Sequence, residues 1–279
     1  MADWSKITSR GNVEDRRGAS ILGFGGGLGG AGLFGIIALL AVNFLMSGGQ
    51  IDLNSVLNQL QTVQPSSPTQ ASQFQGLDSY EEFTSTVLGS TNDTWNQVFS
   101  KSGKPYKQPL LVLFRKATQS GCGIASSQVG PHYCPADETI YLDETFFDEL
   151  KNRFGAKGGD VAEAYVIAHE VGHHVQNRLG IMDRYGTSRD NQDSINLELQ
   201  ADCFAGVWAG SLKNSGVFEP NEFDEAIDAA EAVGDDRIQE AVQGRATPET
   251  WTHGSAEQRK TWLKTGYDTG DPVACNTFK

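Results

Sequence analysis

The stretch DVAEAYVIAHEVGHHVQNRLG, at residues 160–180, decides the fold. Asp160 follows two glycines and can cap a helix, and Gly180 stands where helices commonly end. The residues around the histidines are largely uncharged, as expected for a helix buried beneath a cleft. The stretch therefore predicts a long core helix that runs to Leu179 and carries the motif His169-Glu-Val-Gly-His173.

This motif predicts a metal site. Histidines four residues apart lie on one face of a helix, so His169 and His173 can reach one ion. Glu170 is rotated by roughly 100° from His169 and can hold a water beside that ion. Zinc lowers the pKa of such a water to about 7, and a glutamate can then take its proton. We expect one zinc ion per chain, with Glu170 as the general base.

Two histidines leave a catalytic zinc site short of one protein ligand. The best candidate lies in Asn196-Leu-Glu-Leu-Gln-Ala-Asp-Cys203, where Glu198 and Asp202 share one face of a predicted helix. We expect Glu198 to bind the metal and Asp202 to accept the second N–H of a ligand histidine. A solvated acidic face is the alternative, but the neighbouring side chains are largely apolar, and a buried acidic pair needs partners.

The remaining histidines have weaker signals. His174 points about 100° away from His173 and is expected to pack or to support a ligand. His132 lies in Gly-Pro-His-Tyr-Cys and is most simply a surface residue. His253 precedes a predicted helix and could return to the cleft to stabilise a tetrahedral oxyanion, although a plain role at the start of that helix fits equally well. The strand Ile140-Tyr-Leu-Asp143 could offer its edge to an extended peptide.

Around the long helix, the pattern predicts few strands and many helices. Apolar runs predict strands at 110–114 and 139–142. Helical periodicity or capping residues predict further helices at 77–88, 92–99, 144–153, 194–213, 221–233 and 255–266. The fold class expected is α+β, mainly helical, with a small sheet.

The charge balance limits the possible partners. The 279 residues carry a formal net charge of −13, and the isoelectric point is near 4.8. Because phosphate binding requires a basic surface, this balance argues against a nucleic-acid partner.

The N-terminal region predicts a membrane anchor. Residues 28–46 are apolar and uncharged, which is close to the minimum of about 17 residues for a spanning helix. A cleaved signal peptide is the main alternative, but no small-x-small cleavage site follows the run. Three arginines precede it, and no lysine or arginine occurs between Arg17 and Lys101, so the N-terminus is expected in the cytoplasm. The expected order is a cytoplasmic tail at 1–27, a single transmembrane helix at 28–46, a flexible Gln/Ser/Pro linker at 47–76 and a folded domain at 77–279, on the periplasmic or extracellular side of a bacterial cell membrane.

The four cysteines contain no CxxC pair, which argues against a zinc ribbon or a redox motif. Cys122 and Cys134 bracket a segment rich in Gly and Pro, which suits a closed loop, and Cys203 and Cys275 would form the second pair. An even count outside the cytoplasm is typical of disulfides. Four reduced, buried thiols are the alternative.

Over nearly its whole length the chain resembles the bacterial neutral zinc metallopeptidase family of membrane-anchored proteins. The resemblance implies a zincin-like domain with a gluzincin-like site, in which the roles of His169, Glu170, His173 and Glu198 carry over. One departure is His132, where the family pattern has an aromatic residue. The segments that carry the resemblance are Asn12–Arg17, Cys122–Ala125, Gly130–Pro135, Tyr141–Asp143, His169–Gln176, Glu198–Cys203 and Thr252–Arg259.

These features predict a membrane-anchored zinc metalloendopeptidase that acts on a peptide or protein substrate. One alternative is a non-catalytic cell-envelope protein that keeps zinc for structure or binds a partner. Glu170 argues against it, because a structural zinc site has no use for a base and is normally closed by four ligands. A hydrolase that acts on another bond, such as a cell-wall cross-link, is a third possibility.

Overall fold

A computed structural model describes residues 1–18, 72–73, 78–188, 190–219 and 221–278. The predicted span at 28–46 and nearly all of the predicted linker lie outside these residues. Within the described part of the chain, no helix is long and apolar enough to cross a membrane. Met1–Arg17 and Ser72–Lys279 form one compact unit, which is described below.

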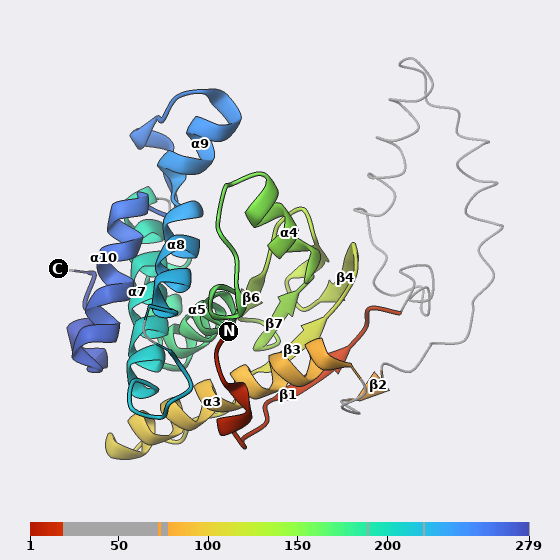
Figure 1. Ribbon diagram of the computed structural model, residues 1–279. Coiled ribbons are helices and arrows are strands. Elements are labelled where there is room, and N and C mark those ends of the chain that lie inside the picture. The colour runs from red at the N-terminus through yellow and green to blue at the C-terminus, as the bar shows by residue number, and fades with distance from the viewer. Residues whose placement is uncertain (19–71, 74–77, 189, 220, 279) are drawn as a thin grey trace, which may run out of the picture. The chain divides into compact units, whose positions relative to one another are not determined.

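Helices make up one side of this unit (Figure 1). The predicted long helix is α5 (Asp160–Arg178), and it packs against α3 (Ser79–Lys101), α7 (Asn191–Ser211) and α8 (Phe223–Ala232), while α10 (Ala256–Thr269) lies along α7. The mainly helical α+β class is thus confirmed. The shorter helices are η1 (Trp4–Lys6), α4 (Thr145–Asn152), α6 (Ile181–Tyr185), α9 (Asp235–Gln243), η3 (Pro248–Thr250) and η4 (Pro272–Ala274).

The larger sheet has five strands in the order β2-β1-β3-β7-β6. They are β1 (Asn12–Asp15), β2 (Ser72–Gln73), β3 (Leu110–Leu113), β6 (His132–Cys134) and β7 (Thr139–Leu142). Strand β3 runs parallel to β1 and β7, whereas β2 is antiparallel to β1 and β6 is antiparallel to β7. A separate hairpin consists of β4 (Ala117–Ser120) and β5 (Gly123–Ser126).

Strand β7 is not an edge strand, so the edge predicted at Ile140–Asp143 is wrong. It pairs with β3 on one side and with β6 on the other. All four of its residues are buried, because one face joins the main core and the other packs in a second cluster with Ala125 of β5. Among the strands that the structure describes, β6 is the edge of the sheet on this side.

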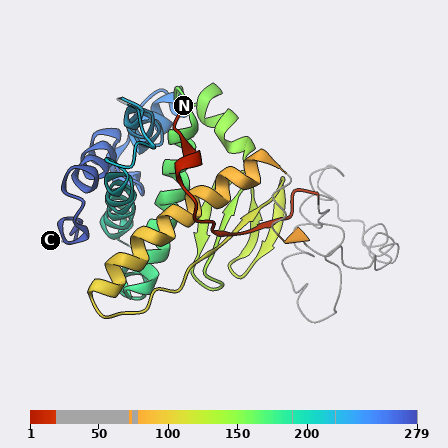
Figure 2. The same ribbon diagram turned by 60° about the horizontal axis from the view of Figure 1, so that its bottom comes forward.

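The sequence predicted a polar tail at the N-terminus, but the structure builds this segment into the domain. Val13 of β1 is buried, and Gly11 exchanges hydrogen bonds with Ser85 of α3 at 2.7 and 2.8 Å. Figure 2 shows the segment lying along α3 before it enters the sheet. The Trp4 indole donates to Asp160 Oδ2 at 2.8 Å. Only one residue of β1 is both apolar and buried, so its own sequence carries little strand signal. The segment forms a strand because it pairs with β2 and β3, which are distant in sequence.

Glycines let α7 and α10 approach almost backbone to backbone. A Cβ atom at Gly206 would lie 2.1 Å from the carbonyl oxygen of Leu263, and one at Gly266 would lie 1.9 Å from that of Cys203. No side chain larger than hydrogen fits at either position without movement of backbone. This close crossing brings Arg259 of α10 to Asp202 of α7.

Both predicted disulfides are present. Cys122, in the turn between β4 and β5, joins Cys134, the last residue of β6, and Cys203 of α7 joins Cys275 near the C-terminus.

Candidate metal centre

Three potential metal donors meet where α5 crosses α7. His169, His173 and Glu198 each offer a ligand atom, and these atoms all lie within 4.8 Å of one another. Glu198 Oε2 is 3.2 Å from Nε2 of His169, and its Oε1 is 3.4 Å from Nε2 of His173. The crossing depends on Gly172 within the motif, since a Cβ there would lie 2.8 Å from the carbonyl oxygen of Ala201. The structure thus brings together the three residues that the sequence proposed as ligands.

The donor set fits zinc. Two imidazole nitrogens and one carboxylate are a combination that catalytic zinc sites use, with one coordination position left for water or substrate. Glu170 follows His169 on α5 and lines the same pocket. Its Oε2 is buried, with no hydrogen-bond partner among the described residues. A carboxylate oxygen of this kind is free to serve as a base.

His169 is held by a buried ionic cluster. Its Nδ1 lies 2.8 Å from Asp202 Oδ1, so Asp202 occupies the position that the sequence predicted. Arg259 donates to both oxygens of Asp202, at 2.8 and 2.9 Å, and the Tyr165 hydroxyl donates to Oδ1 at 2.6 Å. Burial by itself would raise the pKa of Asp202, but Arg259 and His169 together outweigh it and keep that pKa below its ordinary value.

His173 is held by a neutral group instead. Its Nδ1 lies 2.9 Å from Oε1 of Gln176, which is fully buried on the next turn of α5. Neither ligand histidine therefore depends on Nε2 for its support, and both Nε2 atoms face Glu198. This arrangement leaves Nε2 of each ring as the atom that can bind a metal.

The third donor is ionised. Burial by itself would raise the pKa of Glu198, but the neighbouring His173 and His169 outweigh it and hold that pKa well below its ordinary value. The site therefore presents a carboxylate, which is the form that can bind a cation.

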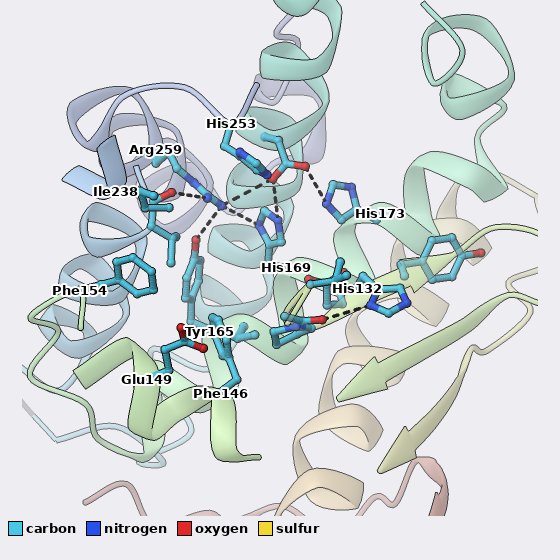
Figure 3. A pocket seen from close by; sticks show the side chains of 18 of the residues that line it. His132, Phe146, Glu149, Phe154, Tyr165, His169, His173, Ile238, His253 and Arg259 are labelled. Carbon is cyan, nitrogen blue, oxygen red and sulfur yellow. Dashed lines mark hydrogen bonds and ion pairs between the residues drawn. The ribbon is translucent and has the colours of Figure 1, made fainter. Parts of the chain in front are cut away.

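The donors lie in a pocket of about 520 Å³. Figure 3 shows one side of it, where Phe146, Phe154 and Ile238 lie near the ring of Tyr165, together with the carboxyl of Glu149. On another side the pocket is lined by His132 and Tyr133 of the edge strand β6 and by the loop 127–131 before it. His132 was interpreted as a surface residue, but its ring lines the pocket and stacks on Tyr141 at 5.5 Å between centroids.

His174 connects helix α5 to the edge strand β6, in line with its predicted packing role. It is fully buried, and burial lowers its pKa to about 4, so the ring is neutral at pH 7. Its Nε2 lies 2.7 Å from the carbonyl oxygen of Lys107, which can only accept, so Nε2 donates there. Nδ1 then accepts from the Tyr133 hydroxyl at 3.0 Å. This bond, with a second one that Asn177 Nδ2 donates to the same hydroxyl at 2.9 Å, connects β6 to α5.

His253 does return to the pocket, where it lies beside His169 and His173 (Figure 3). Its Nδ1 is 3.1 Å from Oδ1 of Asp235, the first residue of α9. The other oxygen of Asp235 accepts the backbone N–H groups of Thr252, His253 and Gly254, at 2.6 to 3.0 Å. One buried carboxylate thus shapes the loop and orients the ring.

Sequence reasoning missed four of these residues, namely Tyr165, Gln176, Asp235 and Arg259. Gln176 and Arg259 lie at the ends of segments that carry the family resemblance, so their positions gave a signal without a role. Asp235 and Tyr165 gave none, because each acts through a residue far away in the chain: Asp235 through His253 and Tyr165 through Asp202.

The fold and the site define an α+β protein with a candidate His–His–Glu metal centre built on two crossing helices. More specifically, the chain belongs to the family described as "Putative neutral zinc metallopeptidase", whose model matches residues 2–278.

Two relatives that the chain matches are themselves named as uncharacterized proteins. The chain is 45% identical over 294 residues to the uncharacterized protein YpfJ of Escherichia coli K12, a match that covers 99% of this chain and 98% of YpfJ. It is 51% identical over 185 residues to the uncharacterized protein Rv2575 of Mycobacterium tuberculosis H37Rv, covering 62% of this chain and 63% of that protein. No solved structure matches the chain.

Proposed function

We propose that this protein is a zinc-dependent endopeptidase of the gluzincin type, on a zincin-like domain. His169, His173 and Glu198 would hold one zinc ion, and Glu170 would act as the general base. The observation that carries the proposal is the buried Oε2 of Glu170, which lacks a hydrogen-bond partner among the described residues and belongs to a side chain that lines the pocket with the three donors. An unpaired buried carboxylate oxygen costs about 1–3 kcal/mol, a cost that a purely structural metal site has no reason to carry.

The chain's own residues can divide the reaction among them. His169, His173 and Glu198 would hold zinc, which would supply Lewis acidity toward the scissile carbonyl and toward the attacking water. Glu170 accepts a proton from the attacking water and returns it to the leaving amine nitrogen. The hydrogen bond from Nδ1 to Asp235 raises the pKa of His253 and so favours its protonated form, whose Nε2–H can donate to the oxyanion that forms. Asp202 and Gln176 hold the ligand rings in place throughout.

An extended peptide fits the edge strand. Among the described strands, β6 pairs with β7 on one side only, and two of its three residues, His132 and Tyr133, line the pocket. A substrate can therefore add as a further strand to β6 and lie across the metal centre, held by main-chain hydrogen bonds. This replaces the role that the sequence suggested for Ile140–Asp143.

The test is metal content and cleavage by the purified full-length chain. We expect about one zinc per chain, because three protein donors and one open position make a complete catalytic zinc site, and we expect hydrolysis of a mixed peptide library. Glu170→Gln should keep the zinc and lose activity by about 10²- to 10⁴-fold, since it removes only the base. A wild-type protein that holds zinc and cleaves no peptide would favour the non-catalytic envelope protein instead.

We further propose that the protein is attached to the membrane through residues 28–46, with its disulfide-bonded domain outside the cytoplasm. The pairing of β1 with β3 favours residues 1–17 and 78–279 lying on the same side, whereas the single crossing expected from the arginines would separate them.

Two exposed positions, Thr8 and Lys104, can test this topology. Thr8→Cys and Lys104→Cys should react alike with a membrane-impermeant maleimide in intact cells. Lysed cells provide the control for total reactivity. Labelling of Lys104→Cys alone would restore the single crossing with a cytoplasmic N-terminus.

A further inference from the structure

The amide of Gln176 fixes the proton of the ligand His173. Gln176 Nε2 donates to the carbonyl oxygen of Leu197 at 2.7 Å and to Oε1 of Gln200 at 3.2 Å. Both amide hydrogens are thereby used, so Oε1 must be the atom that faces His173 Nδ1, 2.9 Å away. In the neutral ring, which is the form that binds a metal, His173 therefore carries its proton on Nδ1, and the lone pair is on Nε2, which faces Glu198.

The amide of Gln200 is fixed in turn. Gln200 lies on α7 and is buried, and its Nε2 donates to the carbonyl oxygen of Cys275 at 2.8 Å. Its Oε1 is consequently left to accept from Gln176. Each of the two amides also donates to a backbone carbonyl, Gln176 to that of Leu197 and Gln200 to that of Cys275, and a carbonyl can only accept. Neither amide can be reversed without setting two acceptors or two donors against each other.

The outer end of this chain of hydrogen bonds is held covalently. Cys275 is buried and bonded to Cys203, which lies three residues after Gln200 on the same helix. Thr277, two residues after Cys275, donates from its hydroxyl to the carbonyl oxygen of Asn196 at 2.7 Å. The disulfide and these hydrogen bonds thus hold the C-terminal segment against the face of α7 that carries Asn196 and Gln200.

We propose that Gln176 and Gln200 are positioning residues for the metal ligand His173, and that the Cys203–Cys275 disulfide anchors them, so that zinc affinity depends on this disulfide. The inference rests on the proposed function only in taking His173 as a metal ligand. Groups that support a ligand histidine in this way typically contribute about 10- to 100-fold to metal affinity.

Zinc affinity of the full-length protein tests the proposal, measured by competition with a chelator. Gln176→Leu should weaken zinc binding by about 10- to 100-fold, because it removes the acceptor of Nδ1–H. Gln200→Leu and the double variant Cys203→Ala/Cys275→Ala should each weaken it in the same direction by about tenfold, at the low end of that range. The d–d absorption spectrum of the cobalt(II)-loaded variants should change as well, since the imidazole can now rotate.

Two matched controls separate this role from general stability. Gln192→Leu alters an exposed glutamine on the same helix, and Cys122→Ala/Cys134→Ala removes the other disulfide. Both should keep the zinc affinity and cobalt spectrum of the wild type. Thermal unfolding of each metal-free variant identifies any that do not fold.

Two results would overturn the proposal. Wild-type zinc affinity and cobalt spectrum in a folded Gln176→Leu variant would remove the positioning role. Wild-type affinity in both the Gln200 and the Cys203/Cys275 variants, with only the unfolding temperature lowered, would leave the disulfide a structural role. Neither measurement needs a substrate, so a protein that binds zinc without cleaving peptides would contradict the proposed activity and leave this inference intact.

Discussion

The two ligand histidines are held by opposite kinds of chemistry. Nδ1 of His169 faces a carboxylate, Asp202, which Arg259 binds through two hydrogen bonds. Nδ1 of His173 faces a neutral amide, that of Gln176. Both partners direct Nε2 toward Glu198, so direction alone requires no charge. The negative charge of Asp202 makes the His169 imidazole a stronger electron donor to a metal. Arg259 offsets that charge, so the Asp202–Arg259 pair adds no net charge to the centre.

The site thus has an ionic half, Asp202 and Arg259 at His169, and a neutral half, Gln176 at His173. The comparison predicts that breaking the ionic half costs more stability than breaking the neutral half. Asp202→Ala removes both hydrogen bonds that Asp202 accepts from the buried Arg259 and should reduce the free energy of unfolding by about 3–5 kcal/mol. Zinc affinity should fall by about 10- to 100-fold as well. Urea unfolding of the metal-free protein and chelator competition measure the two effects. A loss of stability no larger than that of Gln176→Leu would mean that the two halves do not differ.

A double variant separates stability from metal binding in the ionic half. In Asp202→Ala/Arg259→Met both charges are gone, and replacing a buried pair with apolar groups is often close to neutral. Most of the stability lost in Asp202→Ala should therefore return, by about 2–4 kcal/mol, while zinc affinity stays low. Recovery of zinc affinity together with stability would show that Asp202 does not support His169.

The approach of α10 to α7 is the geometric basis of the ionic half. Gly266→Ala would place a methyl group against the backbone of Cys203 and should cost about 1–3 kcal/mol. It should also lower zinc affinity, because Arg259 lies on the helix that is pushed away. Lys264→Ala, at an exposed position on the same helix, is the control and should leave both quantities unchanged. An unaffected zinc affinity would mean that Arg259 tolerates a shift of α10.

The smallest predicted effect concerns Glu163, a partly buried carboxyl group on α5. Its surroundings raise its pKa, whereas those of Asp202 lower the pKa of that residue. Burial, with contributions from the nearby acids Asp160 and Glu144, raises the pKa of Glu163 from 4.5 to about 7. A raised carboxyl pKa favours the protonated form in the folded state, so its cost is absent below pH 4.5, grows up to pH 7 and is constant above.

Glu163→Gln removes this cost and should therefore stabilise the metal-free protein at pH 8. The expected gain is only about 1–2 kcal/mol, because the carboxyl is partly exposed and solvent screens its charge. At pH 5 the gain should be smaller. Urea unfolding at the two pH values measures the difference, and an equal gain at both would exclude the pKa shift as its cause.

The sequence predicted the centre because its spacing is local. His169 and His173, like Glu198 and Asp202, are one helical turn apart, and helical geometry fixes such pairs wherever the helix goes. The sequence could not predict that β1 joins the sheet, because Val13 is the only apolar residue among its four. For the same reason it misplaced the free edge: whether β7 or β6 lies outermost depends on pairing between distant strands.

The sequence by itself determined the metal-binding helix, the acidic pair on the following helix, the two disulfides and the α+β class. Only the tertiary structure decided what surrounds the metal. Arg259 reaches Asp202 because glycines let α10 cross α7 closely, and Gln176 meets Gln200 because Gly172 lets α7 cross α5. Hydrogen-bond partners far apart in sequence are set by such crossings, and a residue's neighbours along the chain do not encode them.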